Sequence, residues 1–176
     1  MPVETCIEAL NQRFPGVEFA PGPLNPTVTF GAAQICLRVA PDRLIEVLDF
    51  LADDPRTRFD QLSDLTCVDY LEFPEARDRF GVIYNLLSTV LNHRLFVKSF
   101  VNDPDPRLGS VTDIWRGAEW LEREVFDMFG IRFDGHPDLR RILMWDGFKA
   151  FPLRKDYPLR GRGEREAFKV IGRESA

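Results

Sequence analysis

The stretch Glu-Arg-Glu-Val-Phe-Asp-Met-Phe at residues 122–129 sets charged side chains among large apolar ones. On a helix that extends from residue 114, successive side chains are turned by about 100°. One stripe of that helix then collects the apolar residues Ile114, Ala118, Leu121, Val125, Met128 and Phe129. The pattern predicts an amphipathic helix whose apolar stripe packs on the core of the domain.

The other side of this helix carries charge. Glu119, Arg123 and Asp127 lie opposite the stripe at spacings of four, where neighbours can form ion pairs. Three aromatic residues also lie outside the stripe: Trp115, Trp120 and Phe126. Aromatic residues and arginine are enriched in protein interfaces, so this side is expected to contact another chain. The alternative is that a second layer of the same domain covers the aromatic residues.

The rest of residues 1–134 alternates between helical and strand patterns. The predicted helices are residues 4–14 and one that starts at Pro41 and ends before Pro55. The predicted strands are a hairpin over residues 28–39 and the runs 65–71, 80–87 and 95–101. Ser110 and Asp113 have nearly the spacing of a capping box for the helix described above. We therefore expect an α+β domain over residues 1–134, mostly an antiparallel sheet with helices packed on one face.

Residues 135–176 have a different character. Proline and glycine interrupt every helical or strand pattern of this segment, yet large apolar residues are frequent in it. Residues 1–134 carry 13 Lys/Arg and 22 Asp/Glu, a balance of −9, whereas residues 135–176 carry 10 and 6, a balance of +4. A segment too irregular to pack on itself and too apolar for water is usually ordered by a partner. The prediction is an extended basic docking arm.

Several classes of function find no support in the sequence. No apolar run reaches the ~20 residues that span a bilayer, and the N-terminus lacks a secretory signal. Cys6, Cys36 and Cys67 are isolated, which argues against disulfides, iron–sulfur clusters and zinc. The acids of residues 122–129 could act as general acid and base, but no nucleophile or nucleotide motif accompanies them. We expect no catalytic, cofactor or metal site.

Residues 122–129, followed by His136, Pro137, Arg140 and Ile142, resemble the signature of a known family, as does the second block at residues 152–159. The family is the C-type (30-kDa-type) subunit of the proton-pumping NADH:quinone oxidoreductase, respiratory complex I. The similarity runs from about residue 62 to residue 159.

The resemblance implies a non-catalytic, cofactor-free subunit of the peripheral arm of that enzyme, on the cytoplasmic side of the membrane. It would bind the quinone-site (D-type) subunit and support electron transfer from NADH to quinone coupled to proton translocation. NADH, FMN, iron–sulfur clusters and quinone would lie on partner subunits. The expected signature and interface residues are Trp120, Glu122, Arg123, Glu124, Asp127, His136, Arg140, Arg141, Arg154, Lys155 and Asp156.

Three other functions stay open, the first from the resemblance and the other two from the residues themselves. The chain could be the equivalent subunit of a membrane-bound hydrogenase or of a plastid or cyanobacterial dehydrogenase. It could also be a nucleic-acid-binding module that uses the basic arm. A small hydrolase that uses the acids of residues 122–129 is the third.

Overall fold

The computed structural model describes residues 3–15, 19, 21–23, 35–74 and 76–163. Its helices are α1 (Val3–Arg13), the short 3₁₀ helix η1 (Pro41–Arg43), α2 (Leu44–Asp53) and α3 (Ala118–Phe129). Its strands are β1 (Pro21–Pro23), β2 (Ile35–Arg38), β3 (Gln61–Asp69), β4 (Phe80–Ser88), β5 (His93–Val101), β6 (Arg107–Gly109) and β7 (Arg132–Asp134).

A five-stranded sheet in the order β1-β2-β5-β4-β3 is the centre of the domain. Only the pairing of β2 with β5 is parallel, and the other three pairings are antiparallel. Two short parallel strands, β6 and β7, form a second sheet. The expected α+β class with a mostly antiparallel sheet is confirmed.

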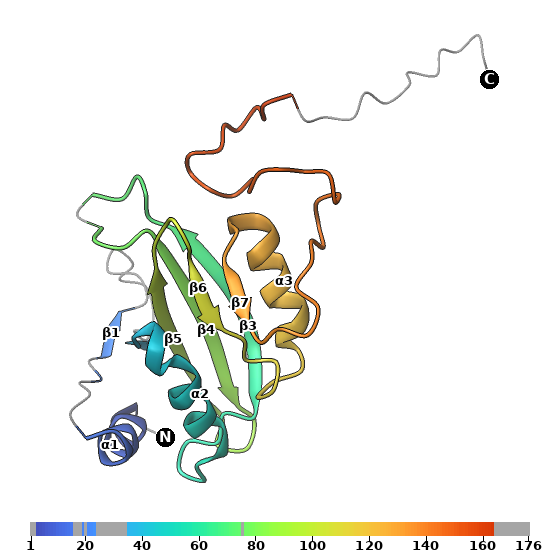
Figure 1. The fold of residues 1–176 in the computed structure, drawn as a ribbon. Coiled ribbons are helices and arrows are strands. Elements are labelled where there is room, and N and C mark those ends of the chain that lie inside the picture. The colour runs from blue at the N-terminus through green and yellow to red at the C-terminus, as the bar shows by residue number, and fades with distance from the viewer. Residues whose placement is uncertain (1–2, 16–18, 20, 24–34, 75, 164–176) are drawn as a thin grey trace.

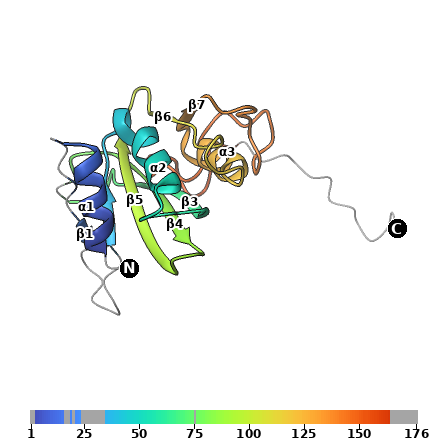
Figure 2. The same cartoon turned by 90° about the horizontal axis from the view of Figure 1, so that it is seen from below.

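Helices cover one face of the main sheet. Alternate residues of β4 and β5 are buried, among them Tyr84 and Val97, while their neighbours Ile83 and Lys98 are half-exposed. Figures 1 and 2 show α2 and α3 against the same face of the sheet. The core therefore lies between the sheet and these helices. No helix in the described part of the chain is long and apolar enough to cross a membrane.

Most predicted elements have counterparts in the structure. The first helix matches α1, and the second, η1 followed by α2, ends at Asp53 before Pro55. The three long strands match β3, β4 and β5, and Asn92 in the turn between the last two has a φ of 51°. Of the predicted hairpin, only Ile35–Arg38 is described as a strand, since residues 28–34 lie outside the described residues.

The predicted start of the signature helix was wrong. Helix α3 begins at Ala118, and its N-cap, Gly117, makes no side-chain capping hydrogen bond. The Ser110 hydroxyl instead donates to the Glu122 carboxylate at 2.7 Å, so it does not cap the helix with Asp113. Residues 111–117 form turns that lead from β6 into α3.

The described part of the predicted arm, residues 135–163, follows β7. Figure 1 shows it running along α3 and looping beyond the end of this helix. Helix α3 ends at Gly130, whose φ of 78° belongs to the left-handed region that glycine adopts readily. A Cβ atom at this position would lie 2.5 Å from the Phe151 ring of the arm. Gly130 thus both ends the helix and makes room for the arm.

Gly130→Ala is expected to destabilise the chain by more than the roughly 1–2 kcal/mol that a left-handed residue costs, because Phe151 must also move. Gly135→Ala is the matched control, since its φ is 89° and no atom lies within 4 Å of an added Cβ. Chemical denaturation of both variants measures the difference. Equal losses of stability would show that Phe151 does not require the glycine.

Candidate functional site

The Asp127 carboxylate joins α3 to the arm. Its side chain is fully buried and accepts hydrogen bonds on both oxygens. The Arg141 guanidinium donates to Oδ1 at 2.5 Å. The backbone N–H groups of Ile142, Leu143 and Met144 donate to Oδ2 at 3.1, 2.8 and 2.8 Å. Burial alone would raise the pKa of Asp127, but the backbone N–H of Met144, the Arg141 side chain and the other two N–H groups outweigh it and lower the pKa.

Two arginines extend this attachment with bonds to carbonyl groups. Arg141 also donates to the Ala150 carbonyl at 3.1 Å, which closes a loop of the arm. Arg123 on α3 donates to the carbonyls of Arg140 and Arg141 at 3.1 and 3.0 Å. The arm therefore has both its N–H and C=O groups bound by side chains of the helix. It is held against α3 by this chain's own residues.

A second group of charged side chains, here called the clasp, attaches residues 154–156 of the arm to the sheet. Its members are Asp69, Arg79, Asp103, Arg154 and Asp156. Arg79 pairs with Asp69, Asp103 and Asp156 at 3.1, 2.6 and 3.0 Å. Arg154 pairs with Asp103 at 3.3 Å and donates to the Phe129 carbonyl at 2.6 Å.

Asp69 is the buried member of the clasp. It also accepts the backbone N–H of Lys155 at 2.9 Å. Burial alone would raise the pKa of Asp69, but its hydrogen bonds, led by those from Arg79 and Lys155, lower the pKa.

Glu122 organises the start of α3. The Val111 N–H and the Ser110 hydroxyl each donate to its carboxylate at 2.7 Å. The side chain is fully buried and has no cationic partner among its hydrogen bonds. Burial raises the pKa of Glu122 to about 7, although the two hydrogen bonds partly oppose the rise. Glu122 thus fixes the turn between β6 and α3 through its own chain.

The remaining predicted site residues are more exposed. Trp120 is 60% exposed, Glu124 is exposed, and Arg140 pairs with Asp138 at 2.7 Å. His136 accepts the Asp138 N–H on Nδ1 and donates from Nε2 to the Glu119 carbonyl at 3.0 Å. Both ring nitrogens of His136 therefore bind backbone groups of this chain. The side chain of Lys155 is exposed as well.

The charged side of α3, which was expected to contact another chain, is covered in part by the arm of the same chain. Arg123 and Asp127 are buried beneath the arm and bind it instead of pairing along the helix. The arm also covers Phe126, whose ring packs against Phe151 at 6.5 Å between centroids. Trp115 precedes the helix, is buried and donates to the Phe59 carbonyl at 3.1 Å. A layer of the same chain therefore covers two of the three aromatic residues.

The predicted partner contacts of several residues become intramolecular ones. Glu122, Arg123 and Asp127 have almost no surface left for another chain, and Arg141 and Arg154 are mostly covered. The reason is that the described part of the arm packs on α3. It does so without helix or strand, because proline and glycine interrupt it. Side-chain carboxylates and guanidinium groups satisfy its backbone instead of a ladder of backbone bonds.

This geometry gives little support to the alternative functions. Glu122 and Asp127 are buried and Glu124 is exposed, so these acids form no shared acid–base site. Arg141 and Arg154 are bound within the chain, which breaks up a basic stripe for nucleic acid. Within the described residues, no three His, Cys, Asp or Glu side chains are grouped as metal ligands.

Sequence reasoning missed three members of the clasp, Asp69, Arg79 and Asp103. Asp69 lies at an inward-facing position of β3, in register with the buried Leu65 and Cys67. An acid at such a position requires a partner, and that signal was present in the sequence. The identity of the partners was not, because Arg79, Asp103 and the arm are far apart along the chain.

Comparison with known proteins identifies the family. Residues 37–163 match the family model described as the 30-kDa subunit of respiratory-chain NADH dehydrogenase. The chain belongs to this family. It is therefore a subunit of the peripheral arm of NADH-quinone oxidoreductase, or complex I.

Curated relatives carry the matching designation, the C-type subunit of NADH-quinone oxidoreductase. The relative from Caulobacter vibrioides is 53% identical over 156 residues, which cover 89% of this chain and 75% of the relative. The relative from Ruegeria pomeroyi is 48% identical over 80% of this chain and 68% of its own length. The relative from Coxiella burnetii is 38% identical over 92% of this chain and 80% of its own length.

Two solved structures share the fold. One is the trypsin-resistant fragment of Nqo5, 34% identical with a TM-score of 0.64, which covers 79% of this chain and 100% of the fragment. The other belongs to an archaeal membrane-bound sulfane sulfur reductase. It is 20% identical with a TM-score of 0.68 over 96% of this chain and 99% of its own, a likeness of fold alone.

Glu122→Gln is expected to remove a pH dependence of stability. The pKa of Glu122 is about 7 in the folded chain, against an ordinary value of 4.5. A raised pKa favours folding at low pH, and this contribution is lost as the pH rises through about 7. The free energy of unfolding of the variant, relative to the wild type, should therefore rise by up to about 3 kcal/mol between about pH 5 and about pH 8.

Urea denaturation at the two pH values measures this difference. The matched control is Glu124→Gln, which removes the same charge from an exposed side chain of the same helix and should show no such trend. A constant difference between Glu122→Gln and the wild type would contradict the buried, proton-binding carboxylate.

Asp127→Asn is expected to loosen the arm. The variant loses the ion pair with Arg141, and its amide N–H groups face other donors, a loss of roughly 3 kcal/mol for a buried pair. Trypsin should then cleave within the arm faster than in the wild type. Asp138→Asn is the control, since Asp138 and Arg140 are an exposed pair worth about 1 kcal/mol or less. Equal cleavage rates in both variants would show that Asp127 does not hold the arm.

Proposed function

We propose that this chain is a scaffold component that holds the quinone-site (D-type) subunit through its α3 helix and arm. In this proposal the chain carries no catalytic residue and no cofactor, and NADH, FMN, iron–sulfur clusters and quinone lie on partner subunits. It acts on the cytoplasmic side of the membrane, and its membrane contact is made through its partners. Electron transfer to quinone and proton translocation are activities of the assembled enzyme.

One observation carries the proposal. In the described part of the chain, nine large apolar side chains are exposed, and five of them lie on α3 or the arm. These five are Trp120, Leu143, Trp145, Leu153 and Leu159. Exposed apolar side chains gathered on one part of a protein mark an interaction surface.

The attachment of the arm gives this surface a fixed shape. Asp127 binds the arm at residues 141–144 and the clasp binds it at residues 154–156, so its apolar side chains are displayed on a folded support. Such an interface loses less conformational entropy on binding than a segment that folds on its partner. The buried residues of the signature therefore support the interface from inside.

Co-expression with the remaining peripheral-arm subunits tests the proposal. Leu153→Asp places a charge at a side chain that is 52% exposed, so the chain should still fold while the amount of quinone-site subunit that co-purifies falls by about tenfold or more. Val90→Asp is the matched control, because Val90 is 58% exposed in the turn between β4 and β5, at the other end of the sheet (Figure 1).

The control variant should assemble like the wild type. Circular dichroism and the unfolding midpoint of each free chain establish that both variants are folded. Normal assembly of Leu153→Asp would refute the arm as the docking surface. Trypsin digestion of free and assembled chains adds a second readout, since a solved relative is named as a trypsin-resistant fragment.

A further inference from the structure

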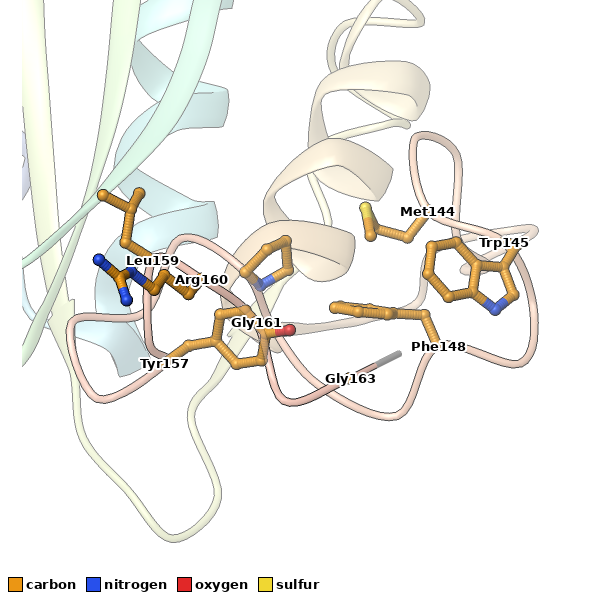
Figure 3. Close-up of a pocket in the computed structure, with 9 residues that line it drawn as sticks. Met144, Trp145, Phe148, Tyr157, Leu159, Arg160, Gly161 and Gly163 are labelled. Atoms are coloured by element: carbon orange, nitrogen blue, oxygen red, sulfur yellow. The ribbon is translucent and has the colours of Figure 1, made fainter. Parts of the chain in front are cut away.

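A cavity lies within the arm itself. It has a volume of about 350 Å³, and Figure 3 shows the side chains that line it. Aromatic rings form its walls: Phe148 lies between Trp145 and Tyr157, with ring centroids 4.9 and 5.9 Å away. Leu159 and Arg160 also line the cavity. A concave, mostly apolar site with few polar groups is the usual form of a binding pocket.

The floor of the cavity is fixed by the rest of the fold. Phe148 is only 5% exposed, and its N–H donates to the Trp145 carbonyl at 3.0 Å. Met144, another lining residue, is bound through its N–H to the buried Asp127. On the opposite side, Gly161 closes a turn with the Pro158 carbonyl at 2.8 Å. The cavity therefore exists before any occupant arrives.

Two side chains at the cavity have no structural role in the described chain. The whole side chain of Leu159 is exposed, with a relative exposure of 104%. Arg160 is exposed and makes no hydrogen bond or ion pair with the residues that the structure describes. None of the described residues that line the cavity carries a carboxylate. An apolar hollow whose edge carries a guanidinium without a partner among the described residues fits an occupant that joins an apolar group to a negative charge.

We propose that this cavity receives an acidic segment of another protein of the complex. A large apolar side chain of that segment enters the cavity and packs against the aromatic rings that line it, and a neighbouring carboxylate pairs with Arg160. The proposal rests on the arm being a docking surface, as proposed above, and adds the chemistry of the segment that it binds. A protein segment is favoured over a small molecule because the exposed Leu153 and Leu143 lie on the same arm and extend the apolar surface beyond the cavity.

A photo-reactive residue tests the occupant directly. Leu159→p-benzoylphenylalanine is incorporated into this chain, the whole complex is assembled, and the cross-linked peptides are identified by mass spectrometry. The expected product joins residue 159 to another protein of the complex, at a segment with Asp or Glu beside an apolar residue. Cross-links confined to residues 164–176 of this chain, to lipid or to a basic segment would overturn the proposal.

A charge reversal tests the ion pair. Arg160→Glu should lower the yield of assembled complex about tenfold and weaken its dependence on salt concentration. Arg132→Glu is the matched control, because Arg132 is exposed in β7, has no ion pair in the described chain and changes the net charge equally. Its yield should stay within about twofold of the wild type. Equal effects of the two variants would reduce the role of Arg160 to net charge alone and overturn the proposal.

The two proposals fail in different ways. If Leu153→Asp weakens assembly while Leu159→Asp and Arg160→Glu do not, the arm docks but the cavity holds no acidic segment. If none of the three variants weakens assembly, the docking function fails together with the cavity. Leu159 and Arg160 suit this comparison because they support no other described residue, so their substitution leaves the fold intact.

Discussion

The hydrogen bonds of the Asp127 carboxylate are the constraint on which the rest of the arm depends. Residues 142–144 turn their N–H groups toward one oxygen, and Arg141 occupies the other. A segment without helix or strand normally needs water for its backbone groups. Here one buried side chain replaces that water, and the irregular segment becomes part of the folded chain.

The buried carboxylates of this chain have different roles at different positions. Asp127 and Asp69 each hold part of the arm, and their hydrogen bonds keep both side chains ionised. Glu122 holds the turn before α3 without a cation, and burial pushes its pKa upward. Side chains of the same acidic type therefore have opposite titration behaviour, which is decided by the donors around each carboxylate.

The sequence predicted the periodic parts of the fold well. The apolar stripe of α3 is buried or half-buried as expected, because its spacing alone decides which side meets the core. The α+β class and the three long strands β3, β4 and β5 followed from the same kind of signal. The helical spacing placed Trp115 outside the buried stripe, but this residue is buried. It precedes the helix, so the turn sets its position.

The intramolecular role of the signature charges could not be predicted. An arginine that binds two carbonyls, as Arg123 does, has the same local sequence as one that binds a partner's carboxylate. The difference depends on the path of the arm. Proline and glycine interrupt the arm, so its sequence has no helical or strand periodicity that would predict this path. The exposed side chains of the arm, by contrast, follow from its apolar composition.

The surface formed by Trp120, Leu143, Trp145, Leu153 and Leu159 also bears on how the protein is produced. Apolar patches that stay uncovered are sites of aggregation. A cell that makes this chain in excess of its partners would hold copies that stick to one another or to chaperones. Balanced synthesis of the components, with prompt joining, is thus a demand imposed by the shape of the arm.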